Sequence, residues 1–224
     1  MTALKVAQNI ANEVGLQAPS SLVGNPNQDA IRLKAAINAA GRYLSGQDWN
    51  SLTTVTTISC STTTEYALPS GFRAMVPLTL WNTTEREQVT GPMTPSQWQV
   101  SLNALGRFSL SEEVRIKMSA GTQFLEFRNT TEAGNLITIY YYTENWVNSG
   151  SMVASISADT DTFLLPERVV EAEAKWRFLK AIGQSFGQEY EEAKEVTQIA
   201  RANDGGLERI RAPQPWRPTL PELF

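Results

Sequence analysis

The sequence contains no histidine and a single cysteine, Cys60, among its 224 residues. Without histidine, the chain lacks the imidazole that most often acts as general acid or base, the Ser-His-Asp and Cys-His nucleophile systems, and histidine-ligated zinc. One cysteine cannot form a disulfide within the chain or the multi-cysteine ligand set of a structural metal site. The sequence therefore predicts a protein that is not an enzyme, with no catalytic residues, no cofactor and no metal.

Long apolar runs and an excess of basic side chains are also missing. No segment approaches the roughly 20 consecutive apolar residues that span a bilayer. The first sixteen residues carry polar side chains such as Lys5, Gln8 and Glu13, whereas a signal peptide has a continuous apolar region, so we expect a chain that works without export and away from membranes. With 19 Lys and Arg against 23 Asp and Glu, the formal net charge is −4, which argues against general binding of nucleic acid through its phosphates.

The residues that are present predict helices near both ends of the chain. Hydrophobic side chains, 42% of the total, recur in three stretches at steps of three and four residues, the pattern of an amphipathic helix. The first stretch ends at Gly15, the second follows a capping residue (Asn27 or Asp29) and stops at Gly46, and the third opens at Pro166. The expected inner-face residues are Leu4, Ala7, Ala11 and Val14; Ala30, Leu33, Ile37, Ala40 and Leu44; and Val169, Ala172, Trp176, Leu179, Ile182 and Phe186, with Glu171, Glu173, Lys175 and Lys180 facing outward.

The middle of the chain has the composition of β-structure. Residues 53–58 are six β-branched residues in a row, which favours an extended backbone. Apolar and polar residues then alternate in 114–118 and 125–128, and an Ile- and Tyr-rich run follows at 136–143, with turn sequences between these runs. The three runs predict a β-meander. The polar, Ser-rich stretch 144–161 is expected to be a long loop, a kind of segment that is either mobile or functional.

These elements predict an α+β fold. The helices at the two ends each need a partner for an apolar face, and the nearest partner is the helix from the other end. We therefore expect a discontinuous helical subdomain from residues 1–50 and 166–204, with an antiparallel β-rich subdomain, residues 51–165, inserted between its halves. The inserted part is a sandwich or a small barrel, and residues 205–224 form an extended, Pro-rich C-terminal tail.

This C-terminal tail differs from an ordinary solvated end. Four prolines after Ala212 prevent a regular helix, and the stretch has too little apolar surface to fold alone. It nevertheless carries large apolar side chains, and a Pro-rich strip with spaced anchors is typical of a segment that binds another chain in extended form. The expected docking residues, which would contact a neighbouring subunit or a partner, are Arg209, Arg211, Pro215, Trp216, Arg217, Leu220, Leu223 and Phe224.

Two further groups of side chains are candidate sites. Glu112 and Glu113 are a possible acid–base pair, but adjacent residues of a strand point to opposite faces and cannot flank one bond, so a solvated turn is the better interpretation. Tyr140 and Tyr142 share one face of the predicted strand and, with Trp146, could form an aromatic platform for a sugar or for a tail component. Packing in the core with a half-exposed strand face is the alternative interpretation.

Several short motifs in residues 39–98 carry a family resemblance. They are Ala39-Ala40-Gly41-Arg42-Tyr43-Leu44, then Trp49 and Leu52 before a Thr-rich strand, then Tyr66-Ala67-Leu68-Pro69-Ser70-Gly71-Phe72-Arg73, and finally Thr94-Pro95-Ser96-Gln97-Trp98. Together they resemble the opening part of the head-to-tail adaptors of short-tailed (podovirus-type) phages, also called connector proteins or tail tubular protein A. The order of helices, strands and tail is similar over nearly the whole chain.

The resemblance implies a structural protein of the virion, located in the neck and tail region and assembled in the host cytoplasm. Members form a ring, commonly of twelve copies, below the portal protein and carry the tail nozzle or tail tube on the other side. The double-stranded genome passes through the centre without specific binding during ejection. The C-terminal segments of such adaptors reach up to the portal, which would supply a partner for the tail at 205–224.

Two other functions stay open at this point. The first is a tail-associated glycan- or receptor-binding module that uses the aromatic face of Tyr140, Tyr142 and Trp146. The second is a hydrolase that acts on a polymer with carboxylates alone, since Asp and Glu are the acid–base groups left in a chain without histidine. We expect the adaptor, a ring component that needs no catalytic residue.

Overall fold

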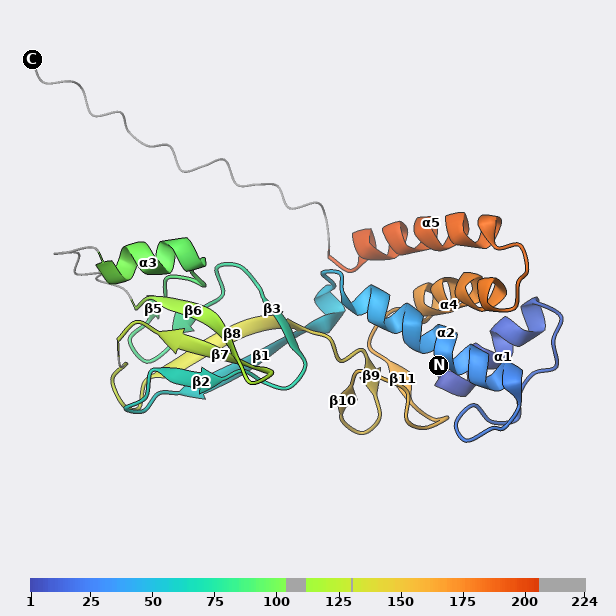
Figure 1. The fold of residues 1–224 in the computed structure, drawn as a ribbon, viewed down its shortest axis with the longest axis horizontal. Helices are drawn as coiled ribbons and strands as arrows, with labels where there is room; N and C mark the ends of the chain where they lie inside the picture. The colour runs from blue at the N-terminus through green and yellow to red at the C-terminus, as the bar shows by residue number, and fades with distance from the viewer. Residues whose placement is uncertain (104–111, 130, 206–224) are drawn as a thin grey trace, which may run out of the picture.

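The computed structural model describes residues 1–103, 112–129 and 131–205. Its helices and antiparallel strands confirm the predicted α+β class. The helices are α1 (Ala3–Glu13), α2 (Gln28–Ser45), the short 3-10 helix η1 (Asn50–Leu52), α3 (Pro95–Asn103), α4 (Glu167–Ala181) and α5 (Gly187–Asn203). Figure 1 shows α1, α2, α4 and α5 gathered at one end of the molecule, and α3 with most of the strands at the other.

The strands form two larger sheets and one small one. They are β1 (Thr53–Ser59), β2 (Glu65–Ala67), β3 (Phe72–Met75), β4 (Trp81–Asn82), β5 (Glu87–Gln88), β6 (Val114–Ser119), β7 (Thr122–Phe127), β8 (Leu136–Thr143), β9 (Val147–Asn148), β10 (Met152–Val153) and β11 (Thr162–Phe163). The five-stranded sheet has the order β1-β8-β4-β5, with β3 also paired to β8, and the two three-stranded sheets have the orders β2-β7-β6 and β10-β9-β11.

The helices from the two ends of the chain pack against each other, as the apolar stripes predict. In α2 the five expected inner-face residues, from Ala30 to Leu44, are all buried. Asn27 caps this helix, because its side-chain oxygen accepts a hydrogen bond from the Asp29 N–H at 2.8 Å. The same core encloses Trp49, whose indole N–H donates to the carbonyl of Leu44 at 2.9 Å.

The predicted inner face of α4 is correct for Val169 and Leu179 and wrong for others, since Ala172 and Trp176 are only partly buried and Phe186 lies beyond the helix. Glu173, expected to face outward, is buried, together with Val170, Ala174 and Phe178. A carboxylate is tolerated in such a place only when it is paired, and Glu173 forms an ion pair with Arg177 on the next turn. Its carboxylate also accepts a hydrogen bond from the Trp176 indole at 2.9 Å. The Glu173 carboxylate, the Arg177 guanidinium and the Trp176 indole therefore meet at a buried position that periodicity assigns to solvent.

The predicted β-meander is correct for its first hairpin and wrong for its third strand. β6 and β7 pair antiparallel from Val114↔Phe127 to Ser119↔Thr122. β8 instead joins the other sheet and pairs with β1 over seven residues, from Thr53↔Tyr142 to Ser59↔Leu136. The β-branched run of β1 gives β8 a full-length partner, and alternate residues of β8 then enter the core between the two sheets.

The two larger sheets share one hydrophobic core. It contains residues of both sheets, such as Val114, Leu125, Ile137 and Ile139, and so lies between their inner faces. This is the arrangement of a sandwich, one of the two forms that the sequence left open. A parallel bridge between Thr90 and Glu113 connects the sheets at one point.

The stretch 144–161, expected to be a loop, is built into the helical end of the molecule. Trp146 is fully buried in the helical core, where its ring stacks on Phe163 with 5.4 Å between centroids. Its indole N–H donates to the carbonyl of Ala154 at 2.8 Å. The ring fits against α2 because residue 41 is a glycine, and a Cβ at Gly41 would overlap the indole. The division into subdomains at residue 165 remains a prediction, although Trp146 and Ile156 lie in the core of the helices.

Two aspartates hold the turns of this stretch. The carboxylate of Asp159 accepts hydrogen bonds from the backbone N–H groups of Leu22 and Val23 at 2.9 and 2.7 Å. Asp161 accepts from the N–H groups of Ser157 and Ala158 at 2.7 and 2.9 Å. Burial alone would raise the pKa of Asp161, but hydrogen bonds from Ser149, Ala158 and Ser157 outweigh it and hold the pKa below its usual value.

A single arginine joins the helical end to the strands. Arg73 of β3 donates from Nη1 to the carbonyl of Gly46 at 3.0 Å, and from Nη2 to the carbonyl of Gln47 at 3.0 Å and the carboxylate of Asp48 at 2.8 Å. Its guanidinium also lies over the ring of Tyr142, 5.2 Å from the centroid. The end of α2 is therefore fixed to both β3 and β8.

We expect Gly41→Ala to destabilise the protein by about 1–3 kcal/mol or more, because the added methyl overpacks the contact with the Trp146 ring. Urea denaturation monitored by circular dichroism measures the change. Gly187→Ala is the matched control, since a Cβ at this first residue of α5 meets no atom within 4 Å. Equal stability of the Gly41 variant and the wild type would contradict the placement of Trp146.

We expect Asp161→Asn to cost about 1–3 kcal/mol at pH 7, since a neutral amide is a weaker acceptor for the two N–H groups that the carboxylate holds. Because the pKa of Asp161 is lowered by folding, its contribution is present above the unfolded pKa of about 3.9 and is lost as the pH falls through the folded value. Denaturation curves from pH 7 downward should therefore converge for variant and wild type. A difference that is constant with pH would contradict this role.

Candidate functional site

The last described residues are held at the junction between helices and strands. The side-chain amide of Asn50 donates to the carbonyl of Asp204 at 2.7 Å, and the N–H of Ser51 donates to the carboxylate of Asp204 at 3.2 Å. The C-terminal end of the described chain therefore lies beside η1, which leads into β1. The predicted docking residues, Arg209, Arg211, Pro215, Trp216, Arg217, Leu220, Leu223 and Phe224, lie outside the described residues.

The structure does not bring the predicted aromatic platform together. Tyr140 is exposed on the outer face of the five-stranded sheet. Tyr142 follows on the same face but is buried, with the Arg73 guanidinium over its ring. Trp146 lies beyond the strand and is fully buried among the helices. Only Tyr140 of the three presents its ring to solvent, so a shared binding face is absent from this part of the chain.

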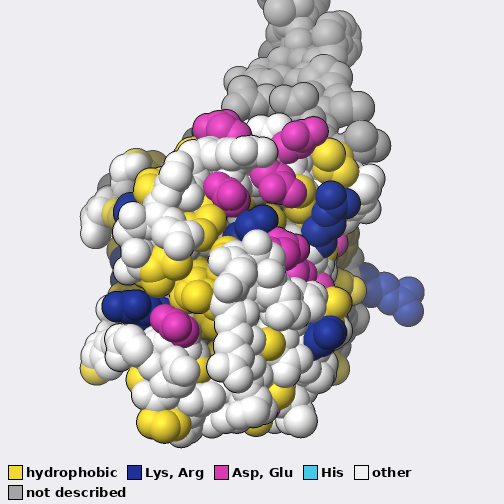
Figure 2. Space-filling model, turned by 90° about the vertical axis from the view of Figure 1, so that its right-hand side faces the viewer, with side chains coloured by type: hydrophobic (Ala, Val, Ile, Leu, Met, Phe, Trp, Pro, Cys, Tyr) yellow, Lys and Arg dark blue, Asp and Glu magenta, His cyan; other side chains and the backbone are white. Residues whose placement is uncertain are grey.

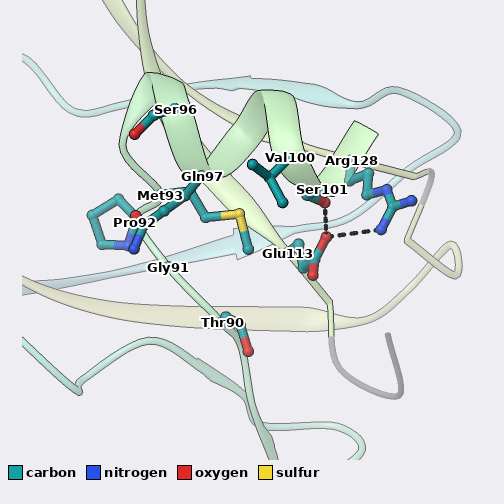
Figure 3. A pocket seen from close by; sticks show the side chains of 10 residues that line it. All are labelled: Thr90, Gly91, Pro92, Met93, Ser96, Gln97, Val100, Ser101, Glu113 and Arg128. Carbon is teal, nitrogen blue, oxygen red and sulfur yellow. Dashed lines mark hydrogen bonds and ion pairs between the residues drawn. The ribbon is translucent and has the colours of Figure 1, made fainter. Parts of the chain in front are cut away.

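The adjacent carboxylates Glu112 and Glu113 have different surroundings, as strand alternation predicts. Glu113 accepts hydrogen bonds from Arg128 Nη1 at 3.0 Å and from the hydroxyl of Ser101, and Figure 3 shows both side chains converging on it. Glu112 has a buried oxygen without a hydrogen-bond partner. Burial, followed by the negative charge of Glu85, raises the pKa of Glu112 above its usual value. The two carboxylates cannot act together on one substrate bond.

A cavity of about 490 Å³ lies beside α3. Its walls are the loop 90–93, one face of α3, and the Glu113–Arg128 pair (Figure 3). Most of its lining is apolar or neutral, including Pro92, Met93 and Val100, and its one carboxylate is occupied by the ion pair. Such a hollow supports contact with apolar side chains better than acid–base chemistry.

The outer face of the sheet β2-β7-β6 is polar and partly covered. Arg115 and Glu126 form an ion pair at 2.6 Å across β6 and β7, and Lys117 pairs with Glu65 at 2.5 Å. α3 lies on this same face, because the ring of its buried Trp98 stacks on the Arg115 guanidinium at 4.7 Å. This side of the sandwich therefore has its own cover and its own charges.

On the outer face of the five-stranded sheet the Arg73 guanidinium lies over the Tyr142 ring, and the paired positions of β1, β8 and β4 are uncharged. Across β1, β8 and β4 the register places Val55 opposite Tyr140, and Thr138 opposite both Thr57 and Trp81. The positions on this face are uncharged, namely Thr53, Val55, Thr57, Ser59, Trp81, Leu136, Thr138, Tyr140 and Tyr142. Its four large apolar side chains, Val55, Trp81, Leu136 and Tyr140, are between 42% and 51% exposed. These apolar side chains alternate with hydroxyl side chains such as Thr57 and Thr138, which lie between Leu136 and Tyr140 in the register.

The helical end carries a different surface. Figure 2 shows acidic side chains gathered on part of it, with lysines and arginines among them. Glu191 of α5 pairs with Lys194 at 3.1 Å, and Glu13 of α1 pairs with Lys175 of α4 at 2.8 Å. Both members of the Glu191–Lys194 pair are exposed, so these charges of α5 face solvent. In residues 1–103, 112–129 and 131–205, no group of three or more His, Cys, Asp or Glu side chains is placed to hold a metal ion.

No helix within the described ranges is long and apolar enough to cross a lipid bilayer.

We expect Glu112→Gln to stabilise the protein at pH 7 by a few tenths of a kcal/mol up to about 1 kcal/mol, because it removes a charge that burial disfavours but that solvent partly screens. Folding raises the pKa of Glu112, so the favourable, protonated state is present below the unfolded pKa of about 4.3 and is lost as the pH rises through the folded value. The advantage of the variant should therefore vanish in urea denaturation curves measured near pH 4.

The neighbouring Glu113→Gln is the matched control, and we expect the opposite sign. It breaks the partly buried pair with Arg128 and should lower stability at pH 7 by about 1–3 kcal/mol. Two variants with the same sign would show that the carboxylates do not face the different environments described above.

The family model described as "SU10 adaptor protein" matches residues 1–219, and so covers almost the whole chain. No curated protein matches the sequence.

Proposed function

Because the chain belongs to the SU10 adaptor protein family, a family of phage head–tail adaptors, we propose that it forms the ring that joins the portal to the tail nozzle or tail tube. The chain is thus a structural adaptor of the phage neck. The finer role follows the short-tailed phage adaptors that the sequence resembles. The family match over residues 1–219 is the observation that carries the proposal.

The fold supports this role through the firm connection between its two ends. A neck component has to keep its portal-facing and tail-facing parts in fixed relation. Here the helical end and the strand sandwich have separate hydrophobic cores, and Arg73 ties the end of α2 to β3 and β8 with three hydrogen bonds and a cation–π contact. The two ends are therefore joined by this side chain as well as by the two stretches of backbone that pass from one core to the other.

In this proposal the C-terminal tail is the portal contact. Twenty residues, 205–224, follow the anchored Asp204, and a fully extended chain of that length spans at most about 70 Å. The spaced anchors Trp216, Leu220 and Phe224 suit extended docking in grooves of the portal, and Arg209, Arg211 and Arg217 suit carboxylates there.

The ring has twelve copies in this proposal, the number common among the adaptors that the sequence resembles, and the double-stranded genome passes through its centre. The formal net charge of −4 per chain is consistent with a channel that does not bind phosphates. DNA would then slide during ejection without specific contacts. The alternative glycan-binding role lacks its platform in this structure, because Trp146 is fully buried.

Co-sedimentation with portal rings from the same source tests the proposal. We expect the full chain to bind in fixed stoichiometry, and a chain truncated after Ala212 to lose at least nine-tenths of the binding. A Trp216→Ala, Phe224→Ala double variant is the finer comparison, with an unchanged melting temperature as the check on folding. Absence of binding by the full chain would contradict the adaptor role, and equal binding by the truncated chain would contradict the portal contact of the tail.

A further inference from the structure

The end of α5 is held by a segment that is distant from it in the sequence. Asn50 Nδ2 donates to the carbonyl of Asp204 at 2.7 Å, and the Ser51 N–H donates to the Asp204 carboxylate at 3.2 Å. These two contacts are here called the latch. We propose that the latch fixes the point and the direction in which the C-terminal tail leaves the subunit, and so positions the tail for its portal contact. The inference rests on that proposed contact and deepens it by naming positioning residues.

The contacts of the latch are not needed to end the helix. Asp204 already donates its own N–H to the carbonyl of Ala200 at 2.9 Å. Gly205, with a φ of 84°, supplies the left-handed residue that commonly ends a helix. Asn50 in addition bonds one of the carbonyls that a helix end leaves without an intrahelical partner. An ordinary helix end therefore accounts for Gly205, and the two bonds from the η1 segment are an addition to it.

Gly205 is also fitted against the latch. A Cβ at this position would overlap Asn50 Nδ2, the atom that donates to Asp204. A larger residue would therefore displace the amide, and it would be strained at a positive φ. The last described residue of the chain is thus held by its own backbone conformation and by its contact with Asn50.

The latch has a large share in placing α5 because the helix buries little of its own surface. Among its seventeen residues, Ala193 and Thr197 are buried, and others are partly buried against the core of the helices. Near the start of α5 the Tyr190 ring packs edge-on against Trp176 of α4, with 5.2 Å between centroids. The helix is therefore positioned by α4 at its start and by the latch at its end.

The latch lies on the segment that also joins the helices to the strands. Arg73 of β3 binds three groups in residues 46–48, and Trp49 is buried in the core of the helices. Asn50 and Ser51 follow directly and lead into β1. The origin of the tail is therefore tied to this same short segment. In a ring, each copy would present its tail from an equivalent place, which lowers the loss of conformational freedom when the tail docks.

Spin-label distance measurements test whether the latch fixes the end of α5. In a Cys60→Ala background, labels are placed at Thr57→Cys in β1 and Ala202→Cys in the last turn of α5, two exposed positions. We expect one narrow distance distribution while the latch is intact. Combining Asn50→Ala with Asp204→Ala, here called the latch double variant, should give about twice that width or more, because a helix end without its contacts frays.

Asn203→Ala is the matched control for this measurement. Asn203 is exposed and directly precedes Asp204, and its side chain forms no hydrogen bond within residues 1–103, 112–129 and 131–205. The control should keep the narrow distribution. Equal widths in the wild type and the latch double variant would overturn the inference.

Portal binding then tests whether the latch positions the tail. We expect the latch double variant to bind portal rings about threefold more weakly, or worse, since the tail loses its fixed origin. Insertion of Gly-Ser-Gly-Ser after Gly205 should weaken binding to a similar extent, because it frees the tail while the latch stays intact. Both changes in one chain should cost no more than the larger one alone. Asp204→Asn should bind like the wild type, because its amide oxygen still accepts from the Ser51 N–H.

The portal contact and the latch fail in different ways. If the wild-type chain does not bind portal rings, or if truncation after Ala212 leaves binding unchanged, the portal contact of the tail is wrong and the positioning role falls with it. If binding depends on the tail but the latch double variant binds like the wild type, the inference alone is overturned. The same holds if the losses from the latch double variant and from the insertion multiply, because the latch then stabilises α5 without positioning the tail.

Discussion

The packing of the Trp146 indole against Gly41 determines how the two ends of the chain meet. The ring occupies the space that a side chain on α2 would fill, and it carries the return segment after β8 into the core of α1, α2 and α4. Once Trp146 is placed, Asp159 and Asp161 lie where they can bond the backbone of the loop after α1 and of their own turn. The helical end is therefore built from three chain segments, namely the N-terminal helices, the segment after β8 that contains Trp146, and α4. The segment after β8 also attaches the strand sandwich to the helical end.

Much of this architecture follows from short-range pattern. The stripe from Ala30 to Leu44 predicts α2 and its buried face, and the alternation in 114–127 predicts the β6–β7 hairpin. The errors arise where partners distant in sequence decide the outcome. β8 follows the hairpin along the chain, but β1, about eighty residues earlier, offers the longer partner. Glu173 has an outward position by periodicity, and the pairing with Arg177 and Trp176 draws it inward. A Ser-rich composition hides Trp146, since one buried ring produces no periodic signal.

The interaction surfaces show the same limit. That Glu112 and Glu113 diverge could be predicted, because alternation is a local property of a strand. The outer face of the five-stranded sheet could not, since Val55, Trp81 and Tyr140 lie on one face only when β1, β8 and β4 are in register. The aromatic residues near it in the sequence make Tyr140 a candidate site residue. In the structure its exposed ring lies opposite Val55, and Trp146 is buried elsewhere. What separates it from Tyr142 is Arg73, which reaches one ring and not the other.

Arg73 also bears on how the subunit responds to force. The chain passes between the helical end and the sandwich near η1 and again after β8, and two such strands of backbone alone would act as a hinge. The Arg73 guanidinium adds a third connection, because it links β3 to two consecutive carbonyls at the end of α2. A force applied at one end of the chain therefore has a path to the other end through this side chain as well as through the backbone.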